Sequence, residues 1–150
     1  IVVALPGCVP VGGPTRGLMR IPTPIYEAMV AHSQFELPNE ACGLLAADAS
    51  GELRMSYCLT NADSSSVSYT IEPMEQFRAM QHAERNGWEV VGAFHSHPHG
   101  PAVPSSVDRR LALDPDWVYV VVGPADASSP DVRAYRIREG VATEELVTVC

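Results

Sequence analysis

The chain of 150 residues has the length of one compact domain, and 46% apolar with 19% charged residues indicate a globular protein. Ten basic and eighteen acidic residues give a formal net charge of −8. This charge disfavours nucleic acid and an anionic membrane surface as partners, because both bind through clustered Lys and Arg.

The first fifteen residues are apolar but are interrupted by three Pro and three Gly residues. Such a segment is too short and too broken to span a membrane. We expect residues 1–15 to form a flexible leader or a leading strand, followed by one domain over residues 16–150. The sequence leaves open whether the leader is processed or serves in targeting.

Three helices are predicted from their start and stop signals. The first begins at Thr23, where Thr suits the N-cap and the following Pro suits the first helical position, and it ends at Leu37-Pro38. The second begins at Pro73 and ends at Asn86-Gly87. A short third helix is expected over residues 105–113. One side of the second helix is predicted to carry its larger side chains: Met74, Phe77, Met80 and Gln81.

Strands are predicted where apolar or alternating residues form short runs. They cover residues 16–21, 41–47, 53–59, 67–71, 90–95, 117–122, 132–137 and 141–149. Helices and strands are mixed without strict alternation, so the fold class is α+β. We expect a curved, mostly antiparallel sheet flanked by helices.

Four cysteines, Cys8, Cys42, Cys58 and Cys150, form no Cys-x-x-Cys pair. Free thiols in a reducing cytoplasm are the simplest interpretation. Because Cys42 and Cys58 both fall in predicted strands, a disulfide between them stays open.

Two histidines stand at the end of a predicted strand, in Phe94-His95-Ser96-His97-Pro98. Residues i and i+2 of a strand point to the same side, so His95 and His97 can reach one ion while Ser96 points away. The chain returns at a helix start, from which Asp108 can supply a carboxylate. Two imidazoles and one carboxylate are typical of a catalytic zinc site whose fourth position is open.

Hydrolysis at such a site also needs a carboxylate that moves the proton of the attacking water to the leaving amine. Glu40, just before a predicted buried strand, is the candidate. The hydroxyl of Ser105 could stabilise the oxyanion of the tetrahedral intermediate.

These residues resemble the signature of the JAMM/MPN+ metallopeptidases: Glu, then His-Ser-His-Pro, then Ser-x-x-Asp. The resemblance implies the MPN/JAB fold, which is cytidine-deaminase-like, with His95, His97 and Asp108 as Zn²⁺ ligands, Glu40 as general base and acid, and Ser105 as oxyanion donor. It implies a zinc metallopeptidase or isopeptidase. Its small prokaryotic members cut ubiquitin-like or sulfur-carrier proteins at a C-terminal Gly-Gly, and we expect such a partner here.

The same residues have other interpretations. Ser105 and Asp108 also form a capping pair, and Glu40 alone would be a solvated loop charge. A non-catalytic interaction module on the same fold, or a RadC-like protein, is the alternative function. Cys42 and Ser96 are weaker candidates for a nucleophile. The natural substrate, the choice between an isopeptide and a linear bond, and a possible homodimer are not readable from the sequence.

Overall fold

The computed structural model describes residues 2–4 and 17–150. In chain order the elements are β1 (Val2–Ala4), β2 (Leu18–Ile21), α1 (Thr23–Phe35), β3 (Cys42–Ala47), β4 (Leu53–Leu59), α2 (Pro73–Arg85), β5 (Glu89–Ser96), α3 (Ser106–Leu111), β6 (Val118–Gly123), β7 (Asp131–Arg138) and β8 (Val141–Val149). The α+β class is confirmed.

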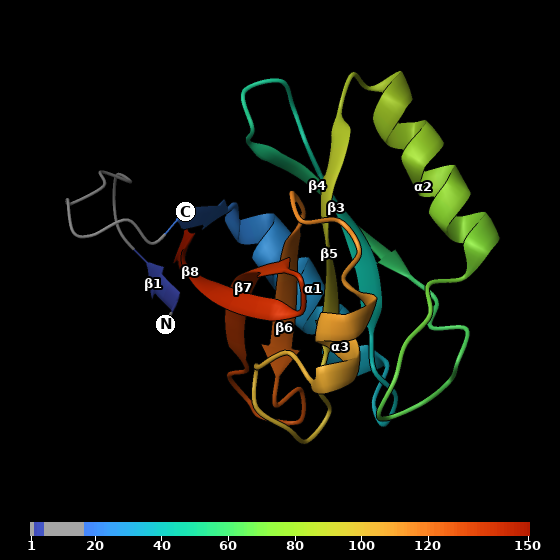
Figure 1. Ribbon diagram of the computed structural model, residues 1–150, viewed down its shortest axis with the longest axis vertical. Coiled ribbons are helices and arrows are strands. Elements are labelled where there is room, and N and C mark those ends of the chain that lie inside the picture. Colours follow the sequence, from blue (N-terminus) through green and yellow to red (C-terminus); the bar gives the residue numbers. More distant parts are fainter. Residues whose placement is uncertain (1, 5–16) are drawn as a thin grey trace.

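Eight strands of the described residues form one curled sheet in the order β1-β8-β7-β6-β5-β3-β4, with β2 also pairing with β8 (Figure 1). The pairs β3–β4, β3–β5, β6–β7 and β7–β8 are antiparallel, whereas β5 and β6 are parallel. The two N-terminal strands also run parallel to β8, so the sheet is mixed. The parallel pair β5–β6 requires a long crossover, and this crossover carries α3 (Figure 1).

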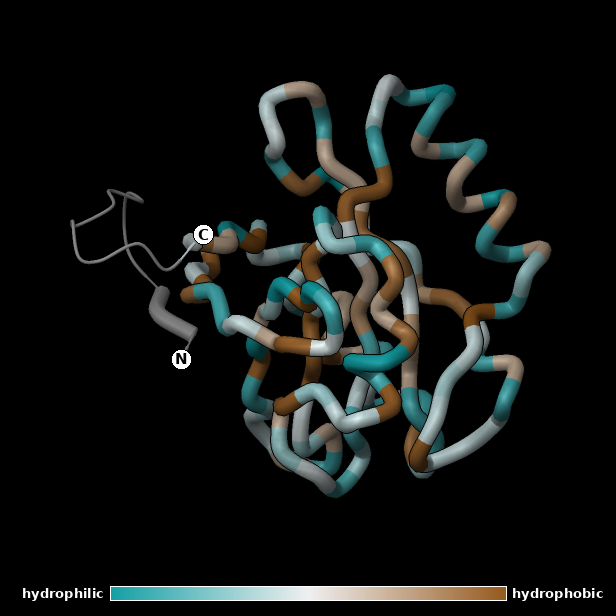
Figure 2. Tube along the Cα trace, in the orientation of Figure 1, coloured by the Kyte–Doolittle hydropathy of each residue, from teal (hydrophilic) through white to brown (hydrophobic). Residues whose placement is uncertain are grey.

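The two long helices cover opposite faces of the sheet. Ile25 and Met29 of α1 pack in one core cluster with Leu45 and Phe94, while Ala79 of α2 packs in another. Figure 2 shows hydrophobic residues concentrated in the central strands, whereas α2 alternates between hydrophilic and hydrophobic positions. The α2 face of the sheet also carries the crossover with α3.

The prediction of a strand over residues 67–71 is wrong. The segment is a loop with a single bridge between Asn61 and Ile71. The buried Asn61 side chain replaces the strand partner: its amide donates to the carbonyl of Ser68 at 2.9 Å, and its oxygen accepts the N–H of Thr70 at 3.1 Å. A side chain that bonds the neighbouring backbone in this way competes with a sheet ladder.

The side of α2 that carries Met74, Phe77 and Met80 faces solvent, with exposed fractions of 53%, 57% and 44%. The helix instead buries Ala79 and Ala83, because small side chains allow it to lie close to the sheet. The prediction grouped these large residues correctly on one side, but that side is not the buried one.

Cys42 and Cys58 are free thiols, so the disulfide left open between them does not form. Direct strand partners share a side, and Cys58 pairs with Gly43, so the two cysteines point to opposite faces. Cys150 is in a disulfide, and the expectation of a free thiol is wrong for this residue.

Most of the expected leader, residues 1 and 5–15, lies outside the described residues. None of the helices within the described part of the chain has the length and apolar composition needed to cross a membrane.

Candidate metal centre

Two imidazoles come together at the carboxyl end of β5. His95 is buried at 3% exposure and His97, just beyond the strand, is half-buried. The N–H of His97 still donates to the carbonyl of Val122 at 2.8 Å, so the chain stays in strand register before Pro98 turns it away. As a result the two Nε2 atoms lie 3.1 Å apart.

Asp108 reaches the same point from α3. Ser105 caps this helix: its hydroxyl accepts the N–H of Asp108 at 3.1 Å, and its own N–H donates to Asp108 Oδ2 at 2.8 Å. This capping box fixes the carboxylate, whose Oδ2 lies 3.0 Å from His95 Nε2 and 3.2 Å from His97 Nε2. The predicted capping pair and the predicted ligand are therefore the same feature.

The three atoms form a nearly equilateral triangle that fits a single metal ion. Donors bound to a tetrahedral zinc ion lie about 3.3 Å apart, close to the spacing found here. The Nδ1 of His97 lies 2.8 Å from the carbonyl of Pro101, which can only accept, so this nitrogen carries the proton. In the neutral ring Nε2 then offers a lone pair to the cluster, as a metal ligand does.

Glu40 is buried beside the triangle at 4% exposure. Its Oε1 lies 4.0 Å from His97 Nε2, and its Oε2 is buried without a hydrogen-bond partner in the described part of the chain. Burial raises the pKa of this carboxyl from 4.5 to about 7, against the lowering effect of His97. A buried carboxylate with one unpaired oxygen and a near-neutral pKa has the properties of a general base and acid.

The loop that carries Glu40 is tied to the sheet on both sides. The N–H of Ala41 donates to Ser96 Oγ at 2.8 Å, and the N–H of Ser96 returns to the carbonyl of Ala41 at 3.0 Å. The amide of Asn61 donates to the carbonyl of Glu40 at 3.1 Å. Ser96 thus points away from the two imidazoles, as expected, and positions the strand that follows Glu40.

The three residues of the cluster shift one another's pKa values. Burial opposes ionisation of Asp108, but its close contacts with the imidazoles of His95 and His97 hold its pKa well below the ordinary value. Burial lowers the pKa of His95. Burial also opposes the charge on His97, yet the Asp108 carboxylate and the Pro101 carbonyl raise its pKa. A carboxylate that stays ionised beside a neutral His95 suits cation binding.

Gly43, three residues after Glu40, is required by close packing. A Cβ at this position would lie 2.0 Å from the carbonyl oxygen of Tyr57 and 2.3 Å from Cε1 of Phe94. Any larger residue would push β3 away from its neighbours and with it the Glu40 loop.

Two other polar groups near the site are not part of the cluster. His99 pairs with Asp126 at 3.0 Å on the surface. Cys42 is buried at 0% exposure, and burial raises its thiol pKa to about 12, so the thiolate needed for nucleophilic attack does not form near neutral pH.

Tyr69 is the site residue that sequence reasoning missed. Its ring stacks on His95 with centroids 4.7 Å apart and planes inclined by 22°. Tyr69 lies between Ser68 and Thr70, whose backbone groups bind the Asn61 side chain. These hydrogen bonds hold the loop so that the Tyr69 ring reaches His95. The sequence signal was only an aromatic residue within a run interpreted as a strand.

Removal of this ring is expected to weaken metal binding. Tyr69→Ala frees the His95 imidazole to rotate, and we expect an affinity loss on the order of tenfold, as for other groups that orient a ligand. Tyr69→Phe keeps the stacked ring and should keep the affinity. Competition for zinc with a coloured chelator measures both. An unchanged affinity in the alanine variant would show that the stack does not position His95.

Comparison with known proteins places this geometry in a family. The sequence profile of prokaryotic homologs of the JAB domain matches residues 22–138. The CysO-cysteine peptidase of Mycobacterium tuberculosis is 37% identical over 126 residues, covering 83% of this chain and 86% of that protein. The "Probable TtuB-protein conjugate cleaving protease" of Thermus thermophilus is 32% identical over 132 residues, covering 86% and 82%.

The solution structure of protein DSY2949 from Desulfitobacterium hafniense superimposes with a TM-score of 0.79 at 37% identity, covering 88% of this chain and 93% of that one. The matched segment runs from the start of α1 to β7 and includes the triangle and Glu40. The chain belongs to the JAMM/MPN family, as a small prokaryotic homologue of the JAB domain.

Proposed function

We propose that this protein is a zinc-dependent peptidase that cuts the amide bond at the C-terminal Gly-Gly of a ubiquitin-like or sulfur-carrier protein. The observation that carries the proposal is the triangle of His95, His97 and Asp108 with Glu40 buried 4.0 Å from it. The similarity to a CysO-cysteine peptidase and to a probable TtuB-protein conjugate cleaving protease supports this substrate class.

His95 and His97, through Nε2, and Asp108, through Oδ2, would hold the metal. This donor set, two nitrogens and one oxygen, is one that zinc accepts in catalytic sites. A bound zinc ion supplies a Lewis acid for the substrate carbonyl and lowers the pKa of water at its open position.

Glu40 would move the proton. With a pKa of about 7 it can take a proton from the attacking water and give it to the departing amine, which becomes a good leaving group. The hydroxyl of Ser105 accepts from the N–H of Asp108, which leaves its own hydrogen free to donate to the developing oxyanion.

The carrier tail would lie in the groove beside Asp108. This groove of about 300 Å³ runs between the 63–71 loop and α3, and its walls include Val67, Tyr69, Val107 and Leu111. An extended chain fits such a groove through its backbone. Two glycines next to the cut bond suit the approach to the metal, because they add no side chain there.

Hydrolysis of a purified CysO–cysteine adduct tests the proposal. The wild-type protein with one equivalent of zinc should release cysteine, and mass spectrometry should show the carrier ending in Gly-Gly. A parallel assay with a TtuB–protein conjugate decides between a linear and an isopeptide bond. A zinc-loaded protein that cleaves neither substrate would refute the peptidase assignment, and a protein that also binds no zinc would favour the non-catalytic interaction module.

A further inference from the structure

Helix α3 is unusual in that it buries none of its residues. Val107 and Leu111 are 39% and 62% exposed, and Leu113, just after the helix, is 86% exposed. The capping box and the cluster at Asp108 hold the helix, rather than an apolar core beneath it. Large apolar side chains gathered around the segment that supplies a site residue are typical of a surface that another molecule covers.

The same helix carries two adjacent cations. Arg109 and Arg110 are exposed, and within residues 2–4 and 17–150 neither guanidinium lies within 4.0 Å of a carboxylate. Arg54, Arg133 and Arg136 have carboxylate partners, but Arg78 and Arg85 on α2 have none among the described residues, so what distinguishes Arg109 and Arg110 is that they are adjacent. An unpaired arginine pair is a local positive feature on a chain of net charge −8.

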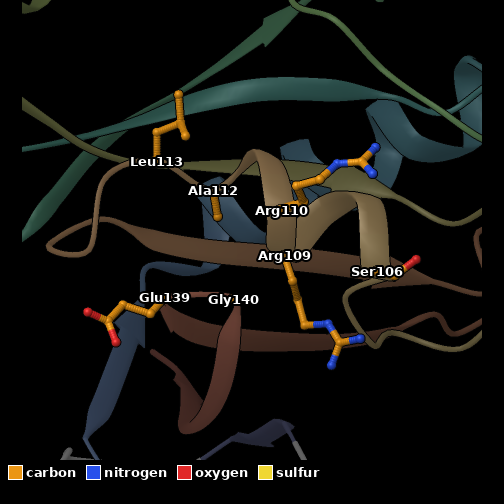
Figure 3. Close-up of a pocket in the computed structure, with 7 residues that line it drawn as sticks. All are labelled: Ser106, Arg109, Arg110, Ala112, Leu113, Glu139 and Gly140. Atoms are coloured by element: carbon orange, nitrogen blue, oxygen red, sulfur yellow. The ribbon is translucent and has the colours of Figure 1, made fainter.

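A hollow adjoins these cations. It has a volume of about 620 Å³ and lies between α3 and the β7–β8 turn at Glu139-Gly140. Figure 3 shows Arg109 and Arg110 leaving the helix in different directions, with Leu113 at the far end and the turn across the hollow. The lining thus combines two cations and one exposed carboxylate, that of Glu139, with an exposed apolar side chain.

We propose that this surface, formed by Arg109, Arg110, Leu113 and the β7–β8 turn, docks the folded body of the carrier protein through an acidic and apolar patch near the root of its tail. The proposal rests on the proposed function, which places the tail in the groove on the other side of α3. The partner is a protein rather than a small anion, because Leu113 and the open hollow offer apolar contact beside the charges.

The position of α3 supports this occupant. The tail groove and the hollow share Ala112, and Asp108 lies near the amino end of the helix. A tail whose last residue reaches Asp108 extends along the helix toward Leu111, so the body of the carrier meets α3 near its carboxyl end. Charge complementarity there would select the partner and speed its association.

Binding of the intact CysO–cysteine adduct to zinc-loaded Glu40→Gln protein tests the docking surface without turnover. We expect Arg109→Glu/Arg110→Glu to raise Kd about tenfold, and to reduce the salt dependence of Kd. Arg78→Glu/Arg85→Glu makes the same charge change on α2 and should leave Kd unchanged. Leu113→Asp, at an exposed position, tests the apolar contact independently and should also weaken binding. A synthetic peptide with only the last residues of the tail should bind all variants equally.

Each outcome decides the proposal. The docking surface is refuted if the double variants on α3 and on α2 bind the adduct with the same Kd. It is also refuted if the Glu40→Gln protein without further changes does not bind the adduct. If the α3 variant loses the tail peptide as well, the arginines act on the groove and not on the carrier body. If the adduct binds through these residues but wild-type protein does not hydrolyse it, docking stands and the proposed peptidase function fails.

Discussion

Replacing Glu40 by glutamine is expected to lower kcat for the CysO–cysteine adduct by about 10³-fold, since removal of a general acid and base typically costs this much. The glutamine side chain would keep the shape of the glutamate but could neither take the proton from water nor give it to the amine. Steady-state kinetics on zinc-loaded protein measures the loss. Because Glu40 is not one of the three triangle residues, the zinc content should stay unchanged.

The same substitution should stabilise the metal-free protein at neutral and alkaline pH. The folded pKa of Glu40, about 7, exceeds its ordinary value of 4.5, so the folded state binds the proton more tightly than the unfolded state. Stability therefore falls as pH rises from about 4.5 to about 7. A neutral glutamine avoids this cost, and above pH 7 the variant should be more stable by up to about 3 kcal/mol.

Urea unfolding in the presence of a chelator at pH 5 and at pH 8 measures this difference. We expect the advantage of the glutamine variant to be clear at pH 8 and small at pH 5. Glu36→Gln, at a partly exposed carboxylate near the end of α1, is the matched control. Equal stability of wild type and Glu40→Gln at pH 8 would contradict a raised pKa for the buried Glu40 carboxyl.

Loss of the metal is expected to abolish both activity and a large part of the stability. At a zinc concentration of 100 times Kd, binding adds about 2.7 kcal/mol to the free energy of unfolding. Chelation should therefore lower Tm, and added zinc should restore both Tm and hydrolysis. His97→Ala removes one of the three donors, so its Tm should no longer respond to zinc. If neither zinc nor chelator changes the Tm of the wild-type protein, the three residues do not form a metal site.

Asp108 and Ser105 allow the ligand role to be separated from the helix cap. Asp108→Ala removes the triangle oxygen and part of the capping box, so zinc binding should be lost. Ser105→Ala removes the other half of the box, at a cost of about 1 kcal/mol, but keeps all three donors and should still bind zinc. If both variants lose zinc equally, the cap and not the carboxylate governs the site.

The parts of the fold that could be predicted are those that depend on residues close together in the sequence. The proline at the start of α1 and of α2 and the glycine after α2 set the helix limits to within a few residues. The triangle was predictable because strand periodicity puts His95 and His97 on one side, and a capping pair marks the helix that carries Asp108. Predicting that these three residues meet required only one assumption about the tertiary structure, namely that the loop after His97 brings the helix with Asp108 back to the strand end.

The remainder depends on contacts that local pattern does not encode. Residues 67–71 alternate like a strand, but the buried Asn61 amide takes their hydrogen bonds and folds them into a loop over the site. Tyr69 reaches His95 only through that loop. Likewise, α2 buries its alanines and exposes Phe77, because the small side chains let the helix lie close to the sheet, and the local sequence does not encode that distance.

The most direct test of the central claim is a crystal structure of the zinc-soaked protein with anomalous data at the zinc absorption edge. The account predicts one strong peak about 2.0–2.2 Å from Nε2 of His95, Nε2 of His97 and Oδ2 of Asp108, with the Glu40 carboxylate beside it. Zinc bound elsewhere, or a peak that lacks any of these three contacts, would contradict it.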